Sequence, residues 1–253
     1  MLDPLFKETS QLWTALCAVA LRLDNRESRS RYTDQLICAV YWWAVIHDRP
    51  VVWACDASNW PSEFVRRQLP SQPTMSRRLR TAAVARLFLA VEKTLLTLST
   101  VAPLVLAIDG KPLPVAWALS SLNVREPRMG VKLVNALTGH GYLLGDSQYD
   151  AAAAADYQLL APQQRPGRGL GRRRHSPHRL RGLELLRTNF GRNLYRRRLA
   201  IERCVAQLTS FVGGLGPLPF WVRRFSRVKL WGHSKLLIHA VHQLKLRERA
   251  ASC

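Results

Sequence analysis

Three carboxylates stand where metal-dependent chemistry on a phosphate ester would need them. Asp109 ends an aliphatic, β-branched run at 101–108, Asp146 ends a second apolar run at 141–145, and Glu202 lies in a later segment of helical character. Carboxylates hold two hard cations about 3.5–4 Å apart, one beside the attacking oxygen and one beside the leaving oxygen. Two strand ends and one helix would fix such ligands, so the set predicts a site for two Mg²⁺ or Mn²⁺ ions.

The segment around Glu202 carries two further polar side chains at helical spacing. Tyr195, Arg198 and Glu202 are related as i, i+3 and i+7, which places them within about 60° of one another on a helix. A hydroxyl, a guanidinium and a carboxylate on one face suit a phosphate beside a metal. Two plainer interpretations stay open: an Arg–Glu pair on a solvated helix face, and strand-end Asp residues that serve as helix caps or turn residues.

The elements that must position these residues follow from the hydrophobic periodicity. Apolar residues recur at helical spacing at 12–23, 34–46 and 82–98, and the period changes after residue 100. The pattern predicts strands at 101–108, 112–119 and 141–146 and helices at 126–137, 150–156, 184–211 and 229–249. We expect an α/β fold, with a helical region at 1–100, the site-bearing domain at 101–253, and an Arg/Gly/Pro loop at 161–182.

The charge of the chain indicates a polyanionic partner. Lys and Arg number 38 against 17 Asp and Glu, giving a net charge of +21 and a pI near 11.0 in 253 residues. Guanidinium groups grip phosphate oxygens bidentately, so the loop arginines are candidate DNA contacts. These are Arg172, Arg173, Arg174 and Arg179. A flexible solvated run, a basic RNA-associated structural protein and a binder of anionic membranes are the competing interpretations.

A helix-turn-helix is predicted at 62–80. Its first helix would cover 62–69, its turn 70–73, and its second helix would begin at an N-cap, Thr74. The second helix of this motif reads the major groove from its N-terminal residues. The expected DNA contacts there are Thr74, Ser76, Arg77 and Arg80. The alternative is a pair of ordinary surface helices with a proline-rich linker.

The cysteines, the N-terminus and the length of the apolar stretches bear on where the protein resides. The five cysteines include no Cys-x-x-Cys pair, which argues against zinc and for reduced residues. The N-terminus has no basic segment before an apolar stretch, and apolar stretches such as 37–46 are too short for a bilayer. We therefore expect a cytoplasmic protein without a membrane partner.

Three motifs in order resemble bacterial insertion-sequence DDE transposases. The segment 108–115, Ile-Asp-Gly-Lys-Pro-Leu-Pro-Val, resembles their first catalytic strand, and 143–150, Leu-Leu-Gly-Asp-Ser-Gln-Tyr-Asp, resembles their second Asp motif. Tyr195, Arg198 and Glu202 resemble the family's Tyr-Arg-Glu signature. That signature usually ends in a Lys seven residues further on, where this chain has Thr209.

The resemblance implies a ribonuclease-H-like core with a mixed, reduced sheet, and an enzyme that cleaves and joins DNA strands during transposition. In such an enzyme Asp109, Asp146 and Glu202 are catalytic residues and metal ligands, while Tyr195 and Arg198 hold phosphate. The partners would be double-stranded DNA, at transposon ends and target, and a second copy of the chain in a homodimer on DNA.

One departure from the family keeps a second function open. Only 37 residues (146 − 109) separate Asp109 from Asp146, and a hairpin normally found between these positions is missing. Loss of one strand would reverse the direction of the chain, so the site would be deformed, and a displacement of about 1 Å costs roughly a hundredfold in rate. The alternative is an internally deleted, catalytically impaired remnant that only binds DNA.

Overall fold

The structure, a computed structural model, describes residues 4–23, 31–64, 68–98, 105–107, 117, 119, 126–135, 140–149, 157–163, 169–170, 175–199 and 206–251. The chain divides into two compact units. Unit 1 consists of residues 1–99 together with 208–253, and unit 2 of residues 100–207.

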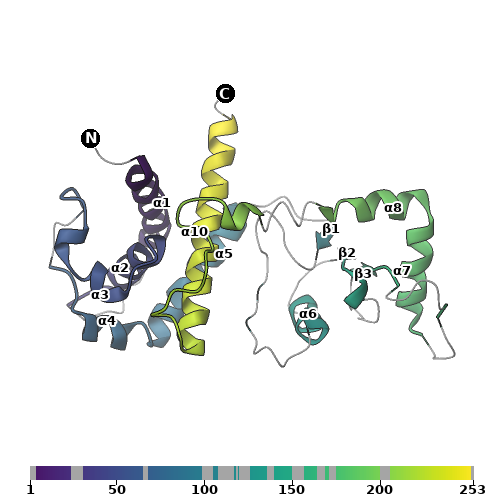
Figure 1. Cartoon of the computed structure of the whole chain (residues 1–253), viewed down its shortest axis with the longest axis horizontal. Helices are drawn as coiled ribbons and strands as arrows, with labels where there is room; N and C mark the ends of the chain where they lie inside the picture. The colour runs from purple at the N-terminus through teal and green to yellow at the C-terminus, as the bar shows by residue number, and fades with distance from the viewer. Residues whose placement is uncertain are drawn as a thin grey trace. The chain divides into compact units, whose positions relative to one another are not determined.

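Unit 1 is built from helices (Figure 1). They are α1 (Pro4–Leu21), α2 (Asp34–Ile46), α3 (Val51–Ala54), the 3-10 helix η1 (Ala57–Asn59), α4 (Gln72–Arg78), α5 (Ala82–Leu98) and α10 (Phe225–Ala251). Helix α2 is the centre, because it is apolar on nearly all sides and packs against α1, α3, α4, α5 and α10. Its N-cap is Thr33, whose hydroxyl accepts from the Leu36 amide at 3.2 Å.

The C-terminal helix belongs to unit 1, which corrects the predicted domain at 101–253. Helix α10 confirms the helix predicted at 229–249 and begins a turn earlier, at Phe225. Trp231, Leu237, Ile238 and Val241 on α10 are buried, and the helix packs on α1, α2 and α5. This apolar face draws the end of the chain back to the N-terminal helices, a long-range contact that local periodicity does not reveal.

Unit 2 contains a small parallel sheet and four described helical segments. Its elements are β1 (Val105–Ala107), α6 (Glu126–Asn135), β2 (Gly141–Leu144), η2 (Ser147–Tyr149), β3 (Tyr157–Leu160), α7 (Pro177–Arg187) and α8 (Asn189–Arg196). The strand order is β1-β2-β3, and both pairs are parallel. Ala107 pairs with Leu144, and Leu144 pairs with Leu160. The α/β class is therefore confirmed, while the ribonuclease-H-like arrangement stays a prediction.

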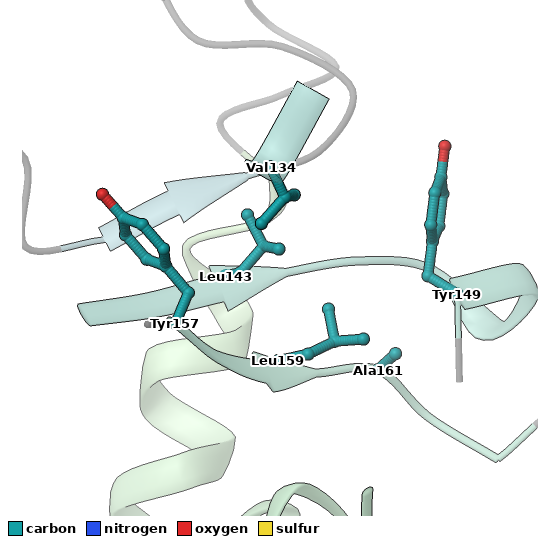
Figure 2. Close-up of a cluster of buried hydrophobic side chains, with 6 residues drawn as sticks. All are labelled: Val134, Leu143, Tyr149, Tyr157, Leu159 and Ala161. Carbon is teal, nitrogen blue, oxygen red and sulfur yellow. The ribbon is translucent and has the colours of Figure 1, made fainter. Parts of the chain in front are cut away.

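Both faces of this sheet are covered. On one face Leu143, Tyr157, Leu159 and Ala161 form a buried cluster with α6 and η2 through Val134 and Tyr149 (Figure 2). On the other face the alternate residues Leu144 and Leu160 pack against Leu194 of α8, with Tyr142, Leu186 and Tyr195 at the margin. Two-sided burial explains why β2 reads as a continuous apolar run rather than an alternating one.

The long helix predicted at 184–211 is wrong as a single element. Helix α7 ends at Arg187, and Thr188 caps a new helix by accepting from the Gly191 amide at 3.0 Å. A Cβ on Gly191 would lie 1.9 Å from the Leu185 carbonyl oxygen. The missing side chain lets α8 turn tightly against α7, which redirects the chain toward the sheet.

Four other predictions concern elements of unit 2. Helix α6 and strand β2 confirm the helix and strand predicted at 126–137 and 141–146, whereas β3 was not predicted. The strand predicted at 112–119 lies outside the described residues except for Trp117 and Leu119, which are in no strand. The helix predicted at 150–156 lies outside them entirely.

Candidate functional site

Asp146 lies at the carboxyl end of the parallel sheet, two residues after β2. The Gly145 amide donates to the Leu160 carbonyl at 3.0 Å, which extends the pairing of β2 with β3 by one residue. The Asp146 carbonyl then accepts from the Tyr149 amide at 3.2 Å as the chain enters η2. Asp146 itself is half-buried. Its carboxylate is thus carried on backbone that is hydrogen-bonded on both sides, as a rigid ligand position requires.

Helix α8 brings a second predicted site residue to this strand end. The Tyr195 hydroxyl donates to the Gly145 carbonyl oxygen at 3.1 Å. The Tyr195 ring is partly buried beside Leu144, Leu160 and Leu194. Residues 50 positions apart in the chain are therefore joined next to Asp146.

The electrostatics place Arg198 in the same cluster. Burial raises the pKa of Tyr195, the Arg198 guanidinium lowers it, and the Asp146 carboxylate raises it. Hydrogen bonding with the Arg198 side chain also lowers the pKa of Tyr195. The proton of the hydroxyl goes to Gly145. Both charges act on one hydroxyl, so Asp146, Tyr195 and Arg198 lie close enough together to interact electrostatically.

The spacing of Tyr195 and Arg198 is achieved by a turn rather than by a continuous helix. The Arg198 amide donates to the Tyr195 carbonyl at 2.9 Å, and the Arg197 amide donates to Leu194 at 3.1 Å, where α8 ends. The i, i+3 relation predicted from the sequence is preserved because a tight turn keeps these two residues on one side.

The other predicted members of this site lie beyond the described residues. They are Asp109, Glu202, Arg172, Arg173 and Arg174. Within the described ranges no group of three or more His, Cys, Asp or Glu side chains is placed to hold a metal. The described part of the site therefore supplies one carboxylate, one hydroxyl and one guanidinium.

Arg179 is tied into the start of α7. Its Nη1 donates to His175 Nδ1 at 2.5 Å, and His175 Nε2 in turn donates to the Leu170 carbonyl at 2.6 Å. The hydroxyl of Ser176 caps α7 by accepting from the Arg179 amide at 3.3 Å. Arg179 thus organises the described end of the basic loop, a structural role that its charge alone did not indicate.

The helix-turn-helix predicted at 62–80 differs from the structure at both of its helices. Residues 62–64 form a turn and 68–70 lie outside any helix, so the helix predicted at 62–69 is wrong at both ends; 65–67 are not described. Helix α4 begins at Gln72 with Ser71 as its N-cap, not Thr74. Pro73 explains the shift, because proline is accepted in the first turn of a helix, where its missing amide is not needed.

The predicted DNA contacts on and just after α4 fall into two groups. Arg80, two residues beyond α4, donates to the Ser76 hydroxyl at 3.1 Å. Thr74 and Arg77 instead line a surface pocket, together with Arg78. Sequence reasoning missed Arg78, which forms an ion pair at 2.5 Å with the buried Asp34. An Asp within the apolar segment 34–46 was the available signal, since a buried carboxylate needs a partner.

Comparison with known proteins adds no relative: no family model, no curated protein and no solved structure matches the chain. None of the helices in the described ranges has the length and apolar character needed to cross a membrane.

Proposed function

We propose that this chain is a DDE transposase that binds transposon-end DNA and catalyses metal-dependent strand cleavage and strand transfer. The observation that carries the proposal is the site at the end of β2, where Asp146, Tyr195 and Arg198 meet. The resemblance of the three sequence motifs assigns a metal ligand and two phosphate-binding groups to these same residues.

The register of the sheet supports Asp109 as the second carboxylate of the proposed site. Strands β1 and β2 are parallel and Ala107 pairs with Leu144. Asp109 and Asp146 each follow these paired residues by two positions. Parallel strands end at the same edge of a sheet, so the register favours Asp109 as the neighbour of Asp146. Despite the shortened interval, β2 runs parallel to β1, which supports the enzyme over a site with reversed chain direction.

The residues present fit a hard divalent cation. Mg²⁺ and Mn²⁺ prefer oxygen ligands, and the half-buried Asp146 carboxylate stands on a hydrogen-bonded strand end. In the proposal Asp109, Asp146 and Glu202 hold two ions, which supply activation of the attacking oxygen and stabilisation of the leaving oxygen.

The chain's own residues orient the substrate. Arg198 would grip a phosphate oxygen, and its guanidinium is already positioned by the Tyr195 hydroxyl. Tyr195 is in turn held by Gly145, so the phosphate-binding group and the carboxylate keep a fixed relation to each other. Thr74, Ser76, Arg77, Arg80, Arg172, Arg173, Arg174 and Arg179 are the proposed DNA contacts outside the site.

A homodimer on double-stranded DNA, in the cytoplasm, completes the proposal. The net charge of +21 supports the DNA partner, because such a charge repels itself unless a polyanion neutralises it.

The second candidate is a remnant that binds DNA without cleaving it. The 37-residue interval between Asp109 and Asp146 favours it, since residues normally found there are missing. It keeps the basic surface and loses only the chemistry.

Metal-dependent nicking of a supercoiled plasmid that carries the element's ends distinguishes the two. We expect nicking in Mg²⁺ or Mn²⁺ by the unaltered protein and its loss in Asp146→Asn and Glu202→Gln. Glu184→Gln is the matched control, because Glu184 is an exposed acid on α7 of the same unit. Tight, salt-sensitive DNA binding without nicking by any protein would leave the remnant as the function.

A further inference from the structure

A pocket of about 810 Å³ opens beside α4, and it lies wholly within unit 1. Four parts of the chain line it: the residues before α2, the residue after α3, the segment that leads into α4, and α4 itself. The lining residues are Arg31, Tyr32, Cys55, Gln68, Leu69, Pro70, Ser71, Thr74, Arg77 and Arg78.

The lining is cationic and rich in hydrogen-bond donors. It includes three guanidinium groups and three hydroxyls, and no lining residue is acidic. Ser71 and Thr74 lie within 3.1 Å of each other through their hydroxyl oxygens. The Tyr32 hydroxyl donates to the Leu69 carbonyl at 3.4 Å. Such a lining suits an anion with several oxygen acceptors.

The three arginines differ in what holds them. The charge of Arg78 is neutralised by Asp34, whose side chain is only 4% exposed. Arg31 and Arg77 are exposed. Arg31 donates to the Gln68 side-chain oxygen and lies over the Tyr32 ring at 5.5 Å, contacts that orient it without neutralising it. Two positive charges therefore remain at the pocket for a ligand.

The size of the pocket indicates what surrounds the anion. Pockets of about 300–1,000 Å³ hold ligands much larger than a phosphate ion. Leu69, Pro70 and the Tyr32 ring supply apolar surface beside the cations. A phosphate with an attached sugar and base fits both properties.

We propose that this pocket binds a phosphodiester of a DNA strand, with Arg31 and Arg77 as the phosphate-gripping residues and Ser71 and Thr74 as further donors. The inference deepens the proposed function and rests on it, because DNA is the partner proposed there. It also distinguishes the predicted DNA contacts: Thr74 and Arg77 line this pocket, whereas Ser76 and Arg80 do not.

The test is the salt dependence of DNA binding by the full chain. The association constant for a labelled duplex is measured by fluorescence anisotropy over a range of NaCl concentrations, without divalent metal. A phosphate contact contributes about 1 to the slope of log K against log salt. We expect Arg31→Ala and Arg77→Ala each to reduce the slope by about 1, and Arg77→Lys to weaken binding while retaining more of the slope, because lysine keeps the charge but loses the fork.

The matched control is Arg22→Ala, which removes an exposed arginine of unit 1 that does not line the pocket. Circular dichroism melting checks that each variant folds. Slopes for Arg31→Ala and Arg77→Ala that equal the slope for Arg22→Ala, in folded proteins, would overturn the proposal.

A second arm separates the source of the phosphate. Inorganic phosphate and chloride are compared as competitors of duplex binding at matched ionic strength. Stronger competition by phosphate, lost in the Arg31→Ala/Arg77→Ala double variant, means that the pocket also takes free phosphate. Equal competition together with the reduced slopes assigns it to the phosphodiester alone.

Failure of the proposed function gives a different result. If the unaltered chain binds no duplex, that function fails as a whole. The pocket is then tested with inorganic phosphate alone by thermal shift, and equal shifts in the unaltered and double-variant proteins would overturn it as well.

Discussion

The Tyr195 hydroxyl donates a hydrogen bond to the Gly145 carbonyl oxygen at 3.1 Å, which ties the end of α8 to the residue that precedes Asp146. Gly145 is buried, so its carbonyl depends on a protein partner. Together with the packing of Leu194 on Leu144 and Leu160, this contact holds the turn that carries Arg198 near the strand that carries the carboxylate.

Tyr195→Phe therefore removes this hydrogen bond but keeps the aromatic ring that packs against the apolar cluster. We expect the free energy of unfolding to fall by about 1 kcal/mol, because a buried carbonyl loses its donor. Plasmid nicking should fall with it, since Arg198 loses the oxygen that orients it. Urea unfolding and the nicking assay measure the two effects.

Tyr142→Phe is the control for this change, because Tyr142 packs in the same cluster on α8 and the sheet. It should leave nicking unchanged. Equal losses in the two variants would contradict the assigned role of the Tyr195 hydroxyl.

Gly182→Ala should separate α7 from β3. A Cβ on Gly182 would lie 2.3 Å from the Leu159 carbonyl oxygen, which is backbone and has little freedom to move. The expected loss is about 1–3 kcal/mol in the free energy of unfolding, the usual effect of overpacking. Gly232→Ala in α10 is the matched control: nothing lies within 4 Å of its added Cβ. Alanine there should stabilise by about 0.5–1 kcal/mol, and a loss there instead would contradict the geometry.

His47 should make the protein less stable in acid. Burial, followed by the nearby charges of Arg49 and Lys235, lowers the pKa of His47 from 6.5 to about 4. The unfolded chain takes up this proton near pH 6.5 and the folded chain does not, so stability is complete above pH 6.5 and is lost as the pH falls toward 4. The shift corresponds to at most about 3 kcal/mol.

His47→Leu should flatten that pH dependence, measured as the free energy of unfolding in urea between pH 7 and 4. His140→Leu, at an exposed position, should leave the dependence as it is. An unchanged profile in the His47 variant would exclude this residue as the source.

Arg78→Ala and Arg77→Ala are neighbouring changes with different expected effects on stability. Arg78 pairs at 2.5 Å with a carboxylate that is 4% exposed, so its loss removes an ion-pair partner of the buried Asp34 and should cost about 2 kcal/mol of stability. Arg77 is exposed, and its loss should leave stability within about 0.5 kcal/mol. Thermal melts of both proteins at low and moderate salt measure the difference. Similar melting temperatures would contradict the structural role of Arg78.

Local patterns were sufficient for several parts of the fold. The apolar run at 141–145 predicts strand β2 and places Asp146 at its end, and periodicity predicts α6 and α10. The spacing of Tyr195 and Arg198 predicts that they share a side. Each of these features depends on residues within a few positions of one another, where side-chain periodicity and backbone geometry are directly coupled.

Other features depend on partners far away in the chain. The pairing of Asp34 with Arg78 joins residues 44 positions apart. The return of α10 to unit 1 depends on which apolar face it meets.

The candidate site shows the same division. Residue types and spacing by themselves indicated Asp146, Tyr195 and Arg198 as candidate site residues. Only the tertiary structure decided that the Tyr195 hydroxyl reaches Gly145 and that Arg198 and Asp146 act on that same hydroxyl. The physical reason is that hydrophobic burial of Leu144, Leu160 and Leu194 brings α8 onto the sheet, and burial is non-directional, so a local pattern marks the faces that pack but not which faces meet.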